Sequence, residues 1–200
     1  MMNLSGPLSE KLALLQEMQE KLNERKLVSG NQEGQHSFLK DRIVLYLNMT
    51  KIIRAEIEHI DELAELFNSY RVFYEQDSNV DLARNFIKSR MENKESTIFV
   101  SQNSDEELIG FVQLYSSFCS VYVCPILILY DLFVKIEARG NGYGRALMNK
   151  ATEFAKSEGY DRLELSTATD NFIGQSLYES LGYERDNDFY HYSLEIDNED

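Results

Sequence analysis

The chain of 200 residues has few cysteines, no long hydrophobic run and no excess of positive charge. Its two cysteines, Cys119 and Cys124, are too few for a disulfide framework or a zinc site. The longest apolar stretch, 121–134, is too short for a membrane span and contains Asp131. A formal net charge of −14 disfavours nucleic-acid binding, because neutralising phosphates requires basic side chains. Since the N-terminus also lacks a signal-peptide layout, we expect a cytoplasmic protein with no metal, nucleic acid or membrane partner.

Composition divides the chain near residue 49. Residues 1–48 carry six basic and six acidic side chains, so the whole net charge lies in 49–200. Leucines at helical spacing in 9–27 are followed by a Ser-, Gly- and Asn-containing stretch typical of a linker. We therefore predict an accessory helix and linker over 1–48, of unassigned role, and one domain over 49–200. Whether Met49 is the native start is left open.

The second part of the chain alternates strand-like and helix-like segments. Short apolar runs predict strands, whereas apolar residues three or four positions apart predict helices. The predicted strands cover 51–55, 97–102, 108–118, 126–134, 163–167 and 189–196, and the predicted helices lie around 60–67, 80–91, 147–158 and 173–181. This order, β-α-α-β-β-β-α-β-α-β, predicts an α/β (α+β) fold with helices packed on a sheet.

A glycine-rich turn between a strand and a helix is the most informative segment. It reads Arg139-Gly140-Asn141-Gly142-Tyr143-Gly144-Arg145. Backbone N–H groups at a helix N-terminus form an anion site, which the helix dipole strengthens. A Walker A loop and a dinucleotide fingerprint both fail here, because Arg145 stands where each requires glycine. Residues 135–162 hold six basic against four acidic side chains, which favours a phosphorylated cofactor.

The spacing Arg-x-x-Gly-x-Gly, made by Arg139, Gly142 and Gly144, resembles the pyrophosphate loop of the GNAT family of N-acetyltransferases. A second segment, 171–183, is similar to that family's Asn-x-x-Ala-x-x-Leu-Tyr-x-x-x-Gly-Phe pattern. Gly174 replaces the usual alanine and Tyr183 the usual phenylalanine. The order of the predicted elements also matches this family. The resemblance implies a GNAT acyltransferase fold, with a mixed central sheet splayed at its fourth strand, and acetyl-CoA as the cosubstrate.

The same resemblance implies which residues contact acetyl-CoA. The pantetheine arm would pair with the end of the central strand, at Leu132, Phe133 and Val134, and the backbone N–H of Val134 would hold the acetyl carbonyl. The pyrophosphate would lie on the glycine-rich turn, at Arg139, Gly140, Asn141, Gly142, Tyr143, Gly144 and Arg145. Asn171 would contact the cofactor from the following helix.

Tyr178 matches the family's tyrosine and is our candidate for the general acid. A phenol is protonated at neutral pH and can donate to the departing thiolate. Asp131 is the candidate base, although strand alternation places it opposite Val134 unless a bulge intervenes. A fixed water or Glu75 remains an alternative base, and purely structural roles for Tyr178 and Asp131 also remain open.

The resemblance implies transfer of an acetyl group to a primary amine by direct attack in a ternary complex. Small amines, polyamine or amino-acid-like, and a protein lysine or N-terminus all remain open as acceptors. Tyr74 and Glu75 lie where related enzymes bind the acceptor, and the acidic surface favours a cationic amine. A homodimer is possible, since dimers are common among relatives. The alternative function is a non-catalytic coenzyme A-binding or protein-interaction module of the same fold.

Overall fold

A computed structural model describes residues 51–196, so the accessory segment predicted for 1–48 and the question of Met49 lie outside the described residues. The described part contains, in order, β1 (Lys51–Arg54), η1 (Ile57–His59), α3 (Ile60–Phe73), α4 (Val80–Glu92), β2 (Ser96–Gln102), β3 (Leu108–Cys119), β4 (Cys124–Val134), η2 (Ile136–Ala138), α5 (Tyr143–Ser157), β5 (Arg162–Leu165) and α6 (Phe172–Ser180).

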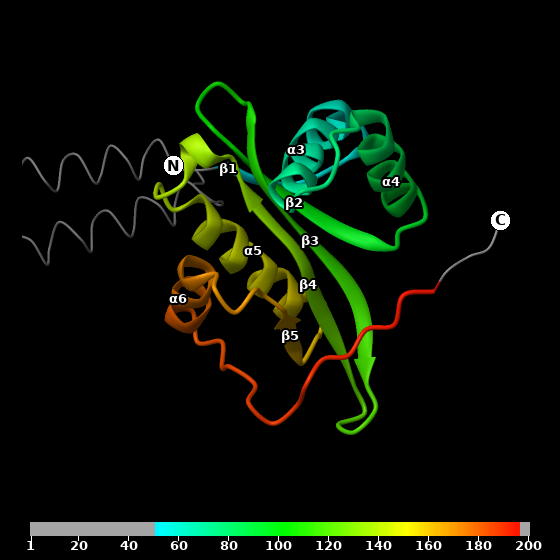
Figure 1. Cartoon of the computed structure of the whole chain (residues 1–200), viewed down its shortest axis with the longest axis vertical. Helices are drawn as coiled ribbons and strands as arrows, with labels where there is room; N and C mark the ends of the chain where they lie inside the picture. Colours follow the sequence, from blue (N-terminus) through cyan, green and yellow to red (C-terminus); the bar gives the residue numbers. More distant parts are fainter. Residues whose placement is uncertain (1–50, 197–200) are drawn as a thin grey trace, which may run out of the picture. The chain divides into compact units, whose positions relative to one another are not determined.

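The five strands form one mixed sheet in the order β1-β2-β3-β4-β5. Neighbouring strands are antiparallel except for β4 and β5, which are parallel. Helices α3 and α4 lie on one side of this sheet, whereas α5 and α6 lie on the other (Figure 1). The predicted α/β fold with a helix-covered mixed sheet is therefore confirmed.

Strands β4 and β5 separate after a short paired segment, which is the splay expected at the fourth strand. Their pairing runs from Ile126 opposite Arg162 to Leu129 opposite Leu165. Strand β4 continues to Val134, so its last five residues have no strand neighbour on the β5 side within the described part of the chain. Backbone groups along this stretch are consequently available to a ligand.

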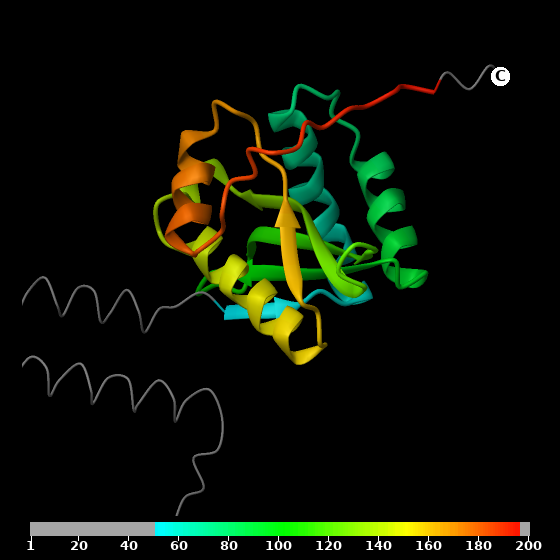
Figure 2. The ribbon, with the colours of Figure 1, turned by 90° about the horizontal axis from the view of Figure 1, so that it is seen from below.

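The predicted strand over 189–196 is wrong, because that segment forms no ladder. Figure 2 draws the chain after α6 as coil, and the apolar side chains of the segment, from Phe189 to Ile196, are 70–91% exposed. The Asp186 carboxylate accepts hydrogen bonds from the N–H groups of Asp188 at 2.8 Å and Phe189 at 3.2 Å, which turns the chain before the segment begins. Alternating apolar residues specify the two faces of a strand, but not the neighbour to which it must bond.

Two apolar layers fill the space between the sheet and its helices. The layer under α3 and α4 includes Leu63, Ile87, Phe111 and Phe133, all buried. The layer under α5 includes Leu114, Leu127, Leu129, Leu147 and Met148, and α6 contributes the half-buried Leu177 and Tyr178. Strand β4 contributes to both layers, because Phe133 packs under α3 and α4 whereas Leu129 packs under α5.

Within residues 51–196, no helix combines the length and the apolar character needed to cross a bilayer. The same part of the chain contains no group of three or more His, Cys, Asp or Glu side chains arranged to hold a metal ion.

Candidate functional site

The glycine-rich turn leads directly into the N-terminus of α5. Gly142 precedes the helix with φ of +86°, and Gly140 has φ of +81°, both in the left-handed region that glycine adopts readily. The first helical hydrogen bond runs from the Ala146 N–H to the Gly142 carbonyl at 3.0 Å. The three preceding N–H groups have no acceptor within the helix, no side chain of residues 51–196 caps this end, and the first turn of the helix carries no acidic residue. This helix end therefore has the properties of an anion site.

Gly144 differs from the other two glycines, because its backbone does not require glycine. It has no positive φ, and a Cβ built there would contact only the Leu177 side chain, at an ordinary 3.5 Å. In a helix, glycine is less stable than alanine by about 1 kcal/mol. The fold alone would favour alanine at this position, whereas a ligand approaching the backbone closely would favour glycine.

The charged side chains of the turn are held by neighbouring groups. Arg139 donates from Nε to the Val134 carbonyl at 3.0 Å, and its guanidinium lies 4.9 Å from the Phe73 ring centroid and 5.6 Å from that of Phe133. Arg145 donates to the Ser180 hydroxyl at 2.7 Å. The two arginines thus bracket the turn, with one bound to the end of β4 and the other to α6. Their contact with a pyrophosphate stays a prediction.

The end of β4 directs backbone groups toward the space that β5 has left. The Lys135 N–H donates to the Ile109 carbonyl of β3 at 2.9 Å. Successive residues of an extended strand direct their N–H and C=O groups to opposite sides, so the backbone of Val134 points away from β3. Of the predicted partners of the pantetheine arm, Leu132 and Val134 thus direct their backbone groups to the open side of the splay, whereas those of Phe133 point toward β3.

A β-bulge sets the orientation of Asp131. Gln113 of β3 pairs with Asp131, but the next residue, Leu114, pairs with Leu129, so Tyr130 is an extra residue in β4. Without it, Asp131 would follow Leu129 onto the α5 face. The extra residue instead places Asp131 on the α3 and α4 face, together with Phe133. The side chain of Val134 packs on the other layer, as simple alternation between residues 131 and 134 predicts.

Asp131 is almost completely enclosed, with 6% of its surface exposed. Burial raises the pKa of its carboxyl group to about 6, and a hydrogen bond with Tyr70 opposes this rise. Burial, followed by the charge of Asp131, raises the pKa of Tyr115 to about 12 and raises that of Tyr70 as well. A carboxyl group with this pKa, close to Tyr70 and Tyr115, is mostly ionised at neutral pH, which is the state required of a general base.

Tyr178, on the other side of the sheet, is half-buried in α6. Burial raises the pKa of its phenol, the proximity of Tyr74 raises it further, and a hydrogen bond with Thr167 lowers it. Tyr74 follows the end of α3, so these two phenols approach each other from opposite layers of the fold. The splay between β4 and β5 therefore brings together Tyr178 and Tyr74, two of the residues expected in the site.

Asn171 caps the N-terminus of α6 and has both side-chain ends occupied. Its Oδ1 accepts from the Gly174 N–H at 3.1 Å, and its Nδ2 donates to the Thr167 hydroxyl at 2.9 Å. A Cβ at Gly174 would lie 2.6 Å from Nδ2 of Asn171, so glycine in place of the family's usual alanine makes room for this cap. The predicted contact of Asn171 with the cofactor stays a prediction.

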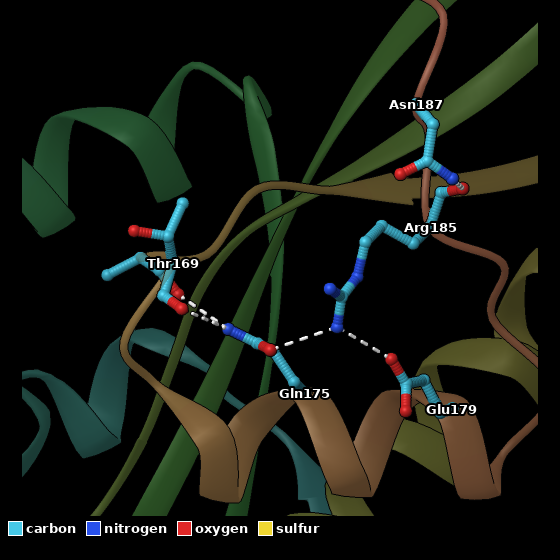
Figure 3. A network of polar contacts seen from close by, with 6 residues as sticks. Thr169, Gln175, Glu179, Arg185 and Asn187 are labelled. Carbon is cyan, nitrogen blue, oxygen red and sulfur yellow. Dashed lines mark hydrogen bonds and ion pairs between the residues drawn. The ribbon is translucent and has the colours of Figure 1, made fainter.

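A polar network holds α6 against the segments on either side of it (Figure 3). Gln175 donates to the carbonyls of Ala168 and Thr169, each at 3.0 Å, which fixes the loop before the helix. Arg185, after the helix, donates to Gln175 at 3.0 Å and to Glu179 at 2.9 Å. Tyr178 belongs to the helix that this network fixes to its two flanking segments.

Glu75, the alternative base, occupies the position that ends α3. Its φ is +60°, and the Gln76 N–H donates to the Arg71 carbonyl at 3.0 Å, which closes a Schellman-type turn. The Glu75 side chain is exposed, unlike that of Asp131. The local role of Glu75 is thus to end the helix, and its part in acceptor binding stays a prediction.

Sequence reasoning missed four residues around Asp131, namely Tyr70, Gln113, Tyr115 and Tyr130. Two of them left a signal. Tyr70 is four residues before Tyr74, hence on the same side of α3. Gln113 interrupts an otherwise apolar strand, which marks a buried polar position. The contribution of Tyr130 had no such signal, because it depends on the bulge.

The sequence profile of the Acetyltransferase (GNAT) family matches residues 60–183. The chain is 43% identical over 145 residues to an uncharacterised N-acetyltransferase, YhfO, of Bacillus subtilis, covering 72% of this chain and 97% of that protein. It is 26% identical over 133 residues to a thialysine N-epsilon-acetyltransferase of Caenorhabditis elegans, covering 66% and 82% of the two chains. A solved structure of a probable acetyltransferase, 37% identical, superposes with a TM-score of 0.69 over 74% of this chain and 99% of the other.

Proposed function

Because this chain belongs to the GNAT family of acetyltransferases, we propose that it transfers the acetyl group of acetyl-CoA to a primary amine by direct attack in a ternary complex. The observation that carries this proposal is the open end of β4 beside the uncapped N-terminus of α5. The first offers backbone groups to an extended arm and the second offers N–H groups to a phosphate. The two features lie next to each other in sequence, joined by η2 and the glycine-rich turn.

The residues present fit both the pyrophosphate and the pantetheine arm of acetyl-CoA. The N–H groups from Asn141 to Arg145 would hold the pyrophosphate, and Gly144 would allow its close approach. Leu132, Phe133 and Val134 would bind the pantetheine arm along the unpaired edge of β4. Bound acetyl-CoA supplies an activated acyl group as a thioester.

The chain's own residues would then move two protons and stabilise one charge. The ammonium of the acceptor loses a proton to Asp131, directly or through a water, and the free amine forms the new C–N bond. The Val134 N–H stabilises the negative charge that develops on the acetyl oxygen. As the C–S bond breaks, the Tyr178 phenol gives its proton to the leaving thiolate, and the second proton that the nitrogen loses as the amide forms restores the phenol. Burial suits both groups, since it keeps Tyr178 protonated and makes Asp131 more basic.

The acceptor is proposed to enter beside Tyr74 and Glu75, at the end of α3. Tyr74 is 51% exposed and close enough to Tyr178 to influence its titration, so an amine bound there lies near the candidate acid. The relative named for thialysine acts on an amine at the end of an alkyl chain, which supports an acceptor of that chemistry.

Thiol release from acetyl-CoA across a panel of amines tests this proposal. The panel should include alkylamines, diamines, amino acids and lysine peptides, and mass spectrometry should identify the acetylated product. Amine-dependent release with one acetyl group added per thiol is the expected result. Tight binding of acetyl-CoA with no turnover on any amine would instead favour a non-catalytic coenzyme A-binding module.

A further inference from the structure

The carboxylate of Asp131 is buried without a cation to balance it. None of the salt bridges in the part of the chain that the structure describes involves this residue. It is nevertheless 6% exposed, and buried carboxylates are normally paired or bound to a cation. An unpaired buried charge is unfavourable, and a cation that reaches it removes much of that cost.

A buried acceptor without a hydrogen-bond donor belongs to the strand beside it. Gln113 is the cross-strand partner of Asp131, so the two side chains leave the same face of the sheet with Cβ atoms about 5 Å apart. Gln113 is fully buried, its Nε2 donates to the Ser96 hydroxyl at 2.8 Å, and its Oε1 has no hydrogen-bond partner. The Gln113 oxygen without a donor and the Asp131 carboxylate, which accepts one hydrogen bond from Tyr70, lie side by side on one face, and together they suit a ligand that carries several N–H groups.

Three tyrosines surround these acceptors. The rings of Tyr115 and Tyr130 are 5.8 Å apart at 80°, which makes a corner of two aromatic walls. Tyr70 reaches the carboxyl group from α3. Tyr130 is 70% exposed, so the cluster is open to solvent on that side. Aromatic faces attract ammonium groups and pack against alkyl chains.

The charged groups on the neighbouring elements that the structure describes form no ion pair with the Asp131 carboxylate. Arg90 of α4 and Glu95 both act on Tyr115, but they form an ion pair with each other. The remaining titratable groups facing Asp131 are phenols, and the raised pKa values of Tyr70 and Tyr115 keep these two neutral at physiological pH. The local charge is therefore negative when Asp131 is ionised.

We propose that this cluster is the acceptor site and that it selects an alkylammonium, held by charge and N–H donation at one end and by aromatic contact along its chain. Its members are Tyr70, Gln113, Tyr115, Tyr130 and Asp131, hereafter the ammonium site. The assignment rests on the proposed function in one respect, because Asp131 then takes the proton of the bound ammonium. A free alkylamine and a lysine side chain share the required chemistry.

Binding without transfer tests the ammonium site. The full chain is titrated, with no coenzyme A present, with butylammonium and with 1-butanol, its uncharged analogue, and NMR follows both ligands and protein. We expect butylammonium to bind at least about 10-fold more tightly than 1-butanol at pH 8. Equal affinity for the two ligands would overturn the proposal.

Three variants localise the binding. Asp131→Asn should weaken butylammonium about 10-fold or more while leaving 1-butanol unchanged, and Tyr130→Leu should weaken butylammonium several-fold. The matched control is Tyr122→Leu, which removes a tyrosine that is 71% exposed at the β3–β4 hairpin, and it should have no effect. Unchanged butylammonium affinity in Asp131→Asn and Tyr130→Leu, with circular dichroism showing both folded, would contradict the assignment.

Turnover measurements separate this proposal from the proposed function. If butylamine is acetylated but Asp131→Asn binds it normally, the ammonium site is wrong and the transferase stands. If the variants behave as expected but no amine is acetylated, the proposed function fails and the site stands. Rates with butylamine and with a lysine peptide then identify which source of the alkylammonium the site accepts.

Discussion

Burial makes the Asp131 carboxylate a stronger base, but it also lowers the stability of the folded protein when the carboxylate is ionised. Its folded-state pKa of about 6, against an ordinary value of 3.8, means that the folded protein binds the proton more tightly than the unfolded chain. Folding therefore disfavours the ionised form, and this penalty is fully present above pH 6 and absent below about pH 4. A shift of this size corresponds to about 3 kcal/mol at most.

We predict that Asp131→Asn stabilises the protein while removing its activity. The uncharged amide avoids the burial penalty, so the free energy of unfolding at pH 8 should rise by about 1–3 kcal/mol, with little change at pH 4. Urea denaturation at the two pH values, alongside acetyl transfer at pH 8, measures both effects. Loss of stability at pH 8 would mean that the carboxylate has a structural role.

The activity of the wild-type enzyme should depend on pH through the ionisation of Asp131. Because Asp131 must be ionised to accept a proton, kcat/KM should fall as the pH decreases through about 6. The relevant measurement is acetyl transfer between pH 5 and pH 9, with thiol release corrected for the free amine fraction. A profile flat from pH 5 to pH 7 would assign the base to another group, such as a water.

The phenol of Tyr178 should matter for rate rather than binding. We predict that Tyr178→Phe lowers kcat by about 100-fold and changes the KM for acetyl-CoA little, since only the proton donor is lost. Tyr183→Phe is the control, because it removes another half-buried phenol of the same layer, on a ring 6.2 Å from that of Tyr178. Equal kcat values for the two variants would show that Tyr178 only packs.

At the scale of elements, the N-terminus of α5 offers a test that separates folding from ligand binding. Gly144→Ala adds a methyl group in ordinary contact with Leu177 and removes the flexibility of glycine from the first turn of a helix. We expect the free energy of unfolding to rise by about 0.5–1 kcal/mol and the KM for acetyl-CoA to increase. Thermal unfolding measures the change in stability, and initial rates measure the KM for acetyl-CoA. An unchanged KM would refute the close approach of the pyrophosphate to Gly144.

The polar network around α6 should affect the rate of transfer more than the stability of the fold. Gln175→Ala releases the loop carbonyls of Ala168 and Thr169 as well as Arg185, all on the surface. Exposed contacts contribute about 1 kcal/mol or less, so stability should change little, whereas kcat should fall several-fold as Tyr178 loses its fixed position. Thermal unfolding with kcat measures this, and a variant as active as wild type would make the network irrelevant to catalysis.

Strand β4 illustrates how much of the site the sequence could predict. Its apolar run predicted a central strand, and the glycine-rich turn after it predicted the helix N-terminus. The sequence did not specify the bulge at Tyr130, because side-chain alternation describes a regular strand and carries no information on an extra residue. For the same reason Tyr115 and Tyr130 were not recognised as neighbours of Asp131.

At the scale of the whole fold, the sheet separates two apolar layers, and the splay interrupts that separation at the end of β4. Asp131 faces α3, whereas Tyr178 belongs to the layer of α5 and α6, and a closed sheet would separate them. Because β5 leaves β4 after Leu129, no strand of residues 51–196 separates the two layers beside the end of β4. Direct transfer in a ternary complex requires this arrangement, since donor and acceptor must be bound together.

The order of elements could be predicted at this scale, since each long element has a clear apolar period. The failure at 189–196 has a physical cause, because a strand is completed only by a bonding neighbour, and the identity of that neighbour is absent from a local pattern. The sequence pointed to a cationic amine only through net charge, and the proposed ammonium site was out of its reach, since that site combines side chains from α3, β3 and β4 that only the fold assembles.

Two-substrate kinetics provide the most direct test of the central claim, which is direct acetyl transfer within a ternary complex. Initial rates of thiol release are measured while acetyl-CoA and butylamine, or the best amine of the panel, are both varied. The account predicts intersecting double-reciprocal lines and acetylated amine equal in amount to the thiol released. Parallel lines, which indicate an acetylated enzyme, or thiol release that does not depend on any amine, would contradict it.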